Sequence, residues 1–189
     1  MAHGLAYYLR QAWKKPEAET LRQRMVEWRH SDTIVRVEHP LRLDRAHALG
    51  FKAKKGVFVV RVRILRGGHK RSRPTKGRRS KRLTIRRTLK LNYKSIAEQK
   101  AARKYVNCEV INSYWIGKDG EHYFFEVILA DKHAPDVLSD KELSFVAKGN
   151  GRAFRGLTSS GIKSRGLLNS VFKVPKVRPS LRANARTGN

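Results

Sequence analysis

Residues 57–65 constrain the fold of this chain more than any other stretch, because they pair an apolar face with a cationic one. The segment reads VFVVRVRIL, and successive side chains of a β-strand point to opposite faces of the sheet. One face therefore carries apolar side chains only, from Phe58 to Ile64 in steps of two. The other face carries Arg61 and Arg63. We predict a strand with one buried face, and with arginine side chains that project from the opposite face, away from the core.

The strand leads directly into a basic run. Residues 66–87 hold eleven Lys and Arg, no acidic residue, and both Pro74 and Gly77. Apolar residues are nearly absent between Gly67 and Arg82, so this segment cannot bury enough apolar surface to fold alone. We predict that it is disordered in the free protein and becomes ordered on an anionic partner.

The charge of the whole chain is large and unevenly distributed. The formal net charge is +28. No Asp or Glu lies between Asp44 and Glu98, a span with 19 Lys and Arg, and none follows Glu142, where ten more cations occur. Between Glu98 and Glu142, nine acids face six cations. Charge that is segregated in this way favours a nucleic-acid face over a general solubility function.

Length and composition indicate one ordinary domain with extensions. The chain has 189 residues, 40% of them apolar, which is enough for a single core. The lone cysteine, Cys108, excludes an internal disulfide and gives no cysteine cluster for zinc. No signal peptide or long apolar run is evident, so we expect a soluble intracellular protein. We divide the chain into N-terminal helices (1–30), a core (31–147) interrupted by a basic extension (66–90), and a basic C-terminal extension (148–189).

Periodicity and turn signals predict the order of helices and strands. Helices are expected at residues 3–13, 17–29, 44–49 and 95–105, and strands at 33–38 and 57–65. The helix at 95–105 is predicted from a capping box of Ser95 and Glu98. Residues 108–131 predict a hairpin closed by a type I′ turn at Asp119-Gly120. In this register Trp115 and Phe124 share a face that we expect to lie under the N-terminal helices.

The last third carries weaker signals. Residues 139–145 are compatible with one turn of helix. Beyond them the tripeptide Arg-Gly-Leu occurs at 155–157 and again at 165–167. Glycine and serine between the two copies predict a flexible cationic strand, with glycines beside arginines that contact phosphate.

The candidate nucleic-acid-binding residues are the Lys and Arg of the cationic segments. In a polyanion complex, each such side chain that neutralises a phosphate releases counterions and adds to affinity. The candidates are Lys52, Lys54, Lys55, Arg61, Arg63, Arg66, Lys70, Arg71, Arg73, Lys76, Arg78, Arg79, Lys81, Arg82, Arg86, Arg87, Arg152, Arg155, Lys163, Arg165 and Arg178.

Two alternative functions, a metal enzyme and a general architectural protein, also fit parts of this sequence. A nuclease or other metal enzyme would need ligands from Asp119, Glu121, His122, Asp131 and His133. In the predicted hairpin Asp119 makes the turn, and Glu121 and His122 point to opposite faces, so they are poorly placed to share an ion. An RNA- or DNA-binding architectural protein without a fixed place in a larger particle would need the same charge, and charge alone does not distinguish it.

Four motifs carry a resemblance to a known family. They are DRAHALGFKAKKGVFVVRVRILRGG at 44–68, NSYW at 112–115, EVILAD at 126–131 and RGLTSSGIKSRGL at 155–167. Together, and in this order, they resemble the eukaryotic-type large-subunit ribosomal protein fifteen family. The chain length and the ending PSLRANARTGN resemble archaeal members. The resemblance covers essentially the whole chain.

This resemblance implies a fold and a function. It implies an α+β fold, with a small antiparallel sheet, helices packed on it, and long basic extensions that become ordered on RNA. The implied function is a structural constituent of the large ribosomal subunit, bound to large-subunit ribosomal RNA and to neighbouring ribosomal proteins in the cytoplasm. It implies no catalysis, cofactor, metal, membrane or small-molecule substrate.

Overall fold

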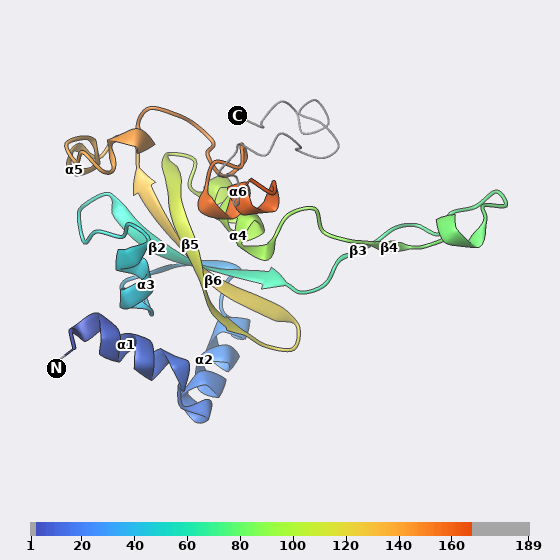
Figure 1. The fold of residues 1–189 in the computed structure, drawn as a ribbon, viewed down its shortest axis with the longest axis horizontal. Coiled ribbons are helices and arrows are strands. Elements are labelled where there is room, and N and C mark those ends of the chain that lie inside the picture. Colours follow the sequence, from blue (N-terminus) through green and yellow to red (C-terminus); the bar gives the residue numbers. More distant parts are fainter. Residues whose placement is uncertain (1–2, 168–189) are drawn as a thin grey trace.

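The computed structural model describes residues 3–167, except for the side chains of Arg86 and Arg87. Its centre is an antiparallel sheet of four strands in the order β1 (Ile34–Val37), β2 (Val57–Leu65), β6 (His122–Asp131) and β5 (Cys108–Lys118) (Figure 1). The predicted strand at 57–65 is confirmed at both ends. The sheet and its helices confirm the α+β class.

Helices and short turns surround this sheet. The α-helices are α1 (Leu5–Lys14), α2 (Ala18–His30), α3 (Leu43–Ala48), α4 (Tyr93–Lys104), α5 (Pro135–Leu138) and α6 (Ser159–Ser164). Two 3₁₀ turns, η1 (Ser80–Arg82) and η2 (Ser144–Val146), and a small ladder of β3 (His69–Lys70) and β4 (Arg86–Arg87) complete the description. The helical turn predicted at residues 139–145 is therefore present only at its end, where η2 begins at Ser144, and residues 139–143 link α5 to η2.

Both faces of the sheet are buried. On one face, Val60 and Val62 of β2 pack with Phe125 and Val127 of β6 beneath Ala97 and Ala101 of α4. On the other face, the apolar side chains of β2, β5 and β6 lie under α2, α3 and the α5–η2 segment. The buried members of this second cluster include Trp28, Ala46, Val59, Phe124, Ile128, Val137 and Val146. A sheet covered on both sides explains why apolar residues occur on both faces of β5 and β6.

The predicted register of the β5–β6 hairpin is right only at its far end. Cys108 pairs with Asp131 as predicted, but Lys118 pairs with Tyr123 instead of Glu121. Bulges between Val110 and Asn112, and between Trp115 and Gly117, account for the difference, since each bulge inserts an unpaired residue. Each bulge shifts the pairing by one residue, so the faces of β5 are exchanged between the two bulges and return to the predicted sides beyond the second.

The predicted type I′ turn is also wrong. Both central residues of such a turn need a positive φ, and neither Asp119 nor Gly120 has one. Instead Asp119 Oδ1 accepts hydrogen bonds from the backbone N–H of Glu121 (2.8 Å) and His122 (2.5 Å). The side chain of Asp119 holds the turn, as aspartate does in many tight loops.

The bulges change the environment of the aromatic side chains. Tyr114 is 2% exposed and shares the cluster that contains Phe124, whereas Trp115 is 40% exposed. The prediction that Trp115 is buried under the N-terminal helices is therefore wrong. The helix cover on Phe124 comes from Trp28 of α2, whose ring centroid lies 5.3 Å away in an edge-to-face arrangement.

The start of α4 differs from the predicted capping box. The N-cap is Asn92, whose side chain accepts from the N–H of Ser95 at 2.8 Å. Glu98 is buried and accepts hydrogen bonds from the hydroxyls of Ser113 and Thr158, both at 2.5 Å. Burial raises the pKa of Glu98, while both hydroxyls oppose that change. Glu98 therefore ties α4 to β5 and to the chain before α6, and does not cap its own helix.

The chain around α6 is compact, so the predicted flexible strand is wrong over these residues. Gly156 has a φ of +67°, and a Cβ on Gly161 would lie 2.6 Å from the Cα of Gly156. The two glycines thus allow a close contact between backbone segments. The hydroxyl of Thr158 caps α6 by accepting from the N–H of Gly161.

Candidate nucleic-acid interface

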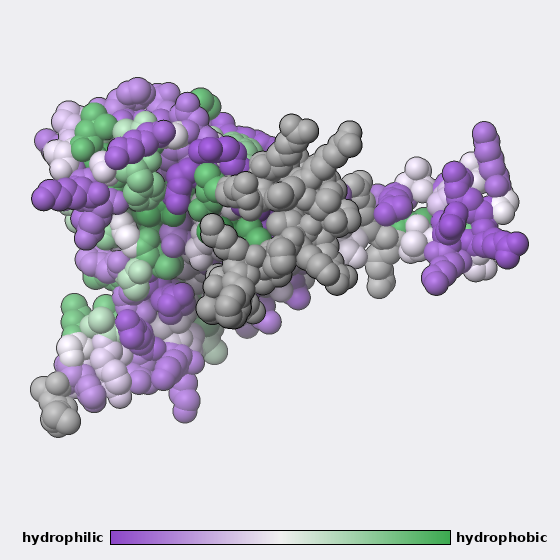
Figure 2. Space-filling view, turned by 45° about the horizontal axis from the view of Figure 1, so that its top comes forward, coloured by the Kyte–Doolittle hydropathy of each residue, from purple (hydrophilic) through white to green (hydrophobic). Residues whose placement is uncertain are grey.

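The basic run forms an extension that projects from the sheet as a narrow hairpin (Figure 1). His69 pairs with Arg87 and Lys70 with Arg86 through the backbone, and the N–H of Arg71 donates to the carbonyl of Ile85 at 2.8 Å. The described residues therefore carry a short ladder where the sequence predicts no regular structure. Figure 2 shows that the surface of this projection is hydrophilic.

Two contacts fix the root of the extension to the core. Gly67 has a φ of +95°, a conformation that favours glycine, and the chain turns out of β2 there. The N–H of Gly67 donates to the hydroxyl of Tyr93 at 2.8 Å, and that hydroxyl donates to the Gly67 carbonyl at 3.2 Å. Tyr93 belongs to α4, so the extension leaves the core from a fixed point.

Beyond its root, the extension presents cations without acidic partners. No Asp or Glu lies between Asp44 and Glu98, a span that contains the whole extension. None of the salt bridges among the described residues involves the extension. Arg78 donates to the carbonyl of Thr75 at 2.6 Å. The exposed cations of the extension whose side chains make no such hydrogen bond to a described carbonyl are Lys70, Arg71, Arg73, Lys76, Arg79, Lys81 and Arg82. Their mutual repulsion favours binding of a polyanion.

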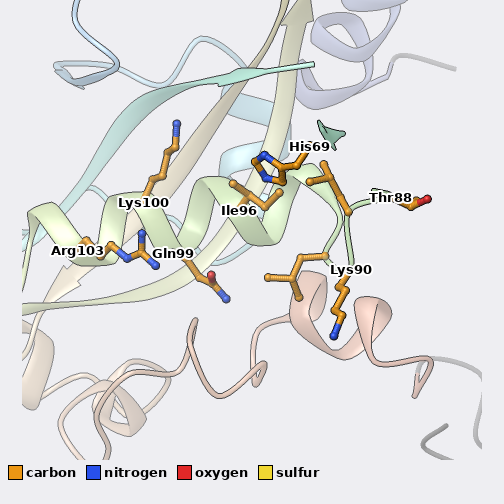
Figure 3. A pocket seen from close by; sticks show the side chains of 9 residues that line it. His69, Thr88, Lys90, Ile96, Gln99, Lys100 and Arg103 are labelled. Carbon is orange, nitrogen blue, oxygen red and sulfur yellow. The ribbon is translucent and has the colours of Figure 1, made fainter. Parts of the chain in front are cut away.

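A groove lies where the extension meets α4 (Figure 3). It has a volume of about 440 Å³ and is lined by Gln99, Lys100 and Arg103 of α4 and by His69 and Lys90 of the extension, among others. Burial lowers the pKa of Lys100, with the nearby charge of Arg63 acting in the same direction. Lys100 and Arg103 are not among the candidates predicted from the sequence, although their spacing of three on a predicted helix places them on one side.

Arg61 and Arg63 have partners within the protein. The guanidinium of Arg61 lies 5.1 Å from the ring centroid of Trp28 and donates to the hydroxyl of Ser31 at 3.3 Å. Arg63 donates to the carbonyls of Trp28 and Arg29. Both cations thus lie against the C-terminal end of α2, where unpaired carbonyls favour positive charge. Their face of the sheet is covered by α2, and the prediction that it faces outward is wrong.

Replacing Arg61 and Arg63 together with glutamine should therefore lower the stability of the free protein. Glutamine keeps hydrogen-bonding capacity but removes two charges from the end of α2, each worth about 0.3–1 kcal/mol there. We expect a fall in the free energy of unfolding of about 0.6–2 kcal/mol, measured by urea denaturation. An unchanged unfolding midpoint together with weaker RNA binding would show that these arginines serve RNA contact alone.

Several other candidates also contact protein groups. Asp140 accepts from the Nζ of Lys52 (2.8 Å) and of Lys54 (2.7 Å), and these lysines hold the pKa of Asp140 well below its usual range. Arg66 donates to the carbonyls of Asp119 and Gly120 at the β5–β6 turn. Such contacts fix loops to the core.

The arginines near α6 behave in the same way. Arg152 donates to the carbonyl of Val110 at 2.7 Å and stacks on Phe145, with 4.5 Å from its guanidinium carbon to the ring centroid. Arg165 donates to the carbonyl of Gly156 at 3.2 Å. By contrast, the remaining described candidates, Lys55, Arg155 and Lys163, are exposed. The side chains of Arg86 and Arg87 and the whole of Arg178 lie outside the described residues.

Limited proteolysis tests the exposure of the extension. Because residues 67–82 project from the core and bury almost nothing, trypsin should cut there first in the free protein and leave both flanking pieces. The order of fragments on a time-course gel, identified by mass, measures this. Early cleavage within the β5–β6 hairpin, with residues 67–82 resistant, would contradict the prediction.

The acids and histidines of the hairpin do not form a metal site in the described structure. Within residues 3–167, no group of three or more His, Cys, Asp or Glu side chains is placed to hold an ion. Asp119 and His122 approach each other, with 3.7 Å between Oδ1 and Nδ1. No helix in the described part of the chain is long and apolar enough to cross a membrane.

A known family model matches nearly the whole chain. The model of the ribosomal L15 family, Ribosomal_L15e, matches residues 4–184. The chain belongs to this family. The resemblance drawn from the four sequence motifs is therefore confirmed.

Relatives of similar length carry the same description. "Large ribosomal subunit protein eL15" of Methanocorpusculum labreanum is 47% identical over 193 residues, covering 100% of both chains. The proteins of the same name from Methanospirillum hungatei and Picrophilus torridus are 46% and 47% identical, over 98% and 94% of this chain and 98% and 95% of their own. These relatives are archaeal, as the sequence analysis expected.

Proposed function

We propose that this chain is a structural constituent of the large ribosomal subunit, where it binds folded ribosomal RNA and stabilises it. One observation carries the proposal. A hairpin of about twenty residues projects from a fixed root and bears exposed cations without acidic partners. A projection of this kind adds almost nothing to the core of the free protein, and its shape and charge suit insertion between RNA helices.

The chemistry of the extension favours recognition of phosphate and shape. A-form RNA helices hide their base edges in a deep, narrow groove, so proteins contact their phosphates and 2′-hydroxyls. Arginine is the commoner cation at positions 71–82, and its planar fork binds phosphate through two parallel hydrogen bonds. Each contact releases counterions, so affinity should fall steeply with salt.

The structure suggests a division among the candidate residues. Those with carbonyl or carboxylate partners, such as Arg63, Arg152 and Lys52, hold the core and its loops together. The exposed extension cations without such partners are Lys70, Arg71, Arg73, Lys76, Arg79, Lys81 and Arg82, and these, with Lys55, Arg155 and Lys163, are available to phosphate. We propose the second group as the principal RNA contacts, joined by Lys100 and Arg103 at the root groove.

The family also suggests neighbours and a location. Relatives are named for the large ribosomal subunit, so we propose that this chain lies in cytoplasmic ribosomes beside other large-subunit proteins. A structural function of this kind requires no catalytic residue.

Sedimentation tests the proposal directly. In a lysate of the source cells, the protein should co-sediment with large subunits and stay bound through a moderate-salt wash. Recovery in the post-ribosomal fraction would instead favour the alternative, an architectural protein of free RNA or of DNA.

A further inference from the structure

A second pocket lies at the free edge of the sheet, away from the extension. In the strand order β5 is an outer strand, and α1, α3 and the first turn of α4 bring side chains to its rim. The pocket has a volume of about 520 Å³, within the range of about 300–1,000 Å³ that is typical of small-ligand sites. Its lining includes Trp13, Arg42, Asp44, Arg45, Lys94 and Trp115.

Two indole rings line this pocket. Trp115 is 40% exposed, although its cross-strand neighbour Phe125 is only 4% exposed. The ring of Trp13 carries the guanidinium of Arg42, whose carbon lies 4.8 Å from the ring centroid. Exposed aromatic faces among cations are the means by which proteins stack unpaired bases, since every base has a π-face.

Polar groups at the base of the pocket lack hydrogen-bond partners. The side chain of Asp44 is 2% exposed, and its Oδ2 accepts no hydrogen bond. The nearest cationic nitrogens are Arg42 Nη2 at 3.7 Å and Arg10 Nε at 3.9 Å, too far for a hydrogen bond. Arg42 Nε is also buried without a partner. Unpaired buried polar groups cost stability, and the edge of a base offers both donors and acceptors that could pair them.

The helix on one side of the pocket is weakly held. No residue of α1 is buried, so the position of Trp13 depends on few contacts. A ligand between α1 and β5 would add contacts to both. The rim cations outnumber Asp44, the single acid in the lining, which favours a ligand that carries phosphate.

We propose that this pocket binds one unpaired nucleotide of RNA, with its base stacked on Trp115 and its phosphate beside Arg45 and Lys94. This inference rests on the proposed function and adds a contact on the folded core to those of the extension. The two contacts differ in kind, because the extension contributes charge alone, whereas the pocket adds a stacking surface to its cations.

Equilibrium binding of the full chain to large-subunit RNA, measured over a range of salt concentrations, tests the proposal. Trp115→Leu should weaken binding by roughly five- to 150-fold, the effect of losing one base–aromatic stack. The slope of log affinity against log salt should not change, because stacking neutralises no phosphate. Trp115→Phe keeps an aromatic face and should retain affinity within about threefold.

A second variant gives an independent reading. Arg45 is exposed, so Arg45→Gln should fold normally and reduce the salt slope by about 0.7–0.9. An RNA affinity of Trp115→Leu equal to that of the parent would overturn the inference. If this variant also assembled less well with ribosomal proteins, the pocket would be assigned to a protein neighbour instead. If the parent protein itself shows no salt-dependent binding to this RNA, the proposed function fails as well, and the two failures are thus distinguishable.

Discussion

Replacing Trp28 with alanine should lower the free energy of unfolding by about 3–5 kcal/mol, the usual cost of truncating a buried large aromatic side chain. Trp28 is 4% exposed and lies in the cluster that joins α2 to the sheet. Its ring packs edge-to-face on Phe124 and beneath the guanidinium of Arg61. Alanine would remove both contacts and leave a cavity between helix and sheet. The melting temperature should fall by about 6–20 °C, since each kcal/mol shifts it by about 2–4 °C in a chain of this size.

Trp115→Ala is the matched control for this measurement. It removes the same side chain at a position that is 40% exposed, and exposed substitutions usually change stability by less than about 0.5 kcal/mol. Both variants are compared with the parent by thermal melting of the free protein. Equal losses in the two variants, or a larger loss for Trp115→Ala, would show that the described packing of α2 is wrong.

Neutralising the extension should have the largest effect on RNA binding. We expect the variant with Arg71, Arg73, Arg79 and Arg82 all replaced by glutamine to bind large-subunit RNA about a hundredfold or more weakly near physiological salt. If each arginine neutralises one phosphate, the salt slope should fall by about 2.8–3.6 in total. All four side chains are exposed, so the melting temperature should stay within a few degrees of the parent.

A variant with equal charge change elsewhere separates this effect from net charge. Arg22, Lys118, Lys141 and Lys148 are exposed and lie outside the extension. Their joint replacement by glutamine lowers the net charge by the same amount and should reduce the slope far less. Similar losses in both quadruple variants would mean that the whole cationic surface binds RNA without a specific site.

The regular parts of this fold could be predicted from the sequence because their signals are local. The alternation of apolar and cationic residues in β2 depends only on the chain itself, and both of its ends were predicted. Gly50 is a similar local signal, because it follows α3 in a left-handed conformation (φ +95°), where glycine commonly ends a helix. The extension was recognised because its lack of acids and apolar residues is a matter of composition.

The remaining features depend on contacts between distant segments. Three glutamates are buried, and each accepts hydrogen bonds from residues far away in the sequence. Glu98 binds Ser113 and Thr158, Glu109 binds the backbone N–H of Gly151 at 2.5 Å, and Glu126 binds that of Leu41 at 3.1 Å. No local pattern marks such partners. For the same reason, sequence alternation could not show that α2 covers the arginines of β2.

The bulges of β5 limited the prediction of the candidate site as well. Counting in steps of two from Asp119 places Trp115 on the buried face of Phe124, and the bulge between Trp115 and Gly117 reverses that assignment. Trp115 thus became a candidate for base stacking only once the register was known.

Chemical footprinting of large-subunit RNA, with and without the protein, tests most directly whether the extension binds a defined place in folded RNA. The parent protein should protect a compact set of nucleotides, and the quadruple arginine variant of the extension should lose most of that protection at the same concentration. The quadruple control variant should keep it. Uniform weak protection along the RNA, or an identical footprint from the parent and the extension variant, would contradict the proposal.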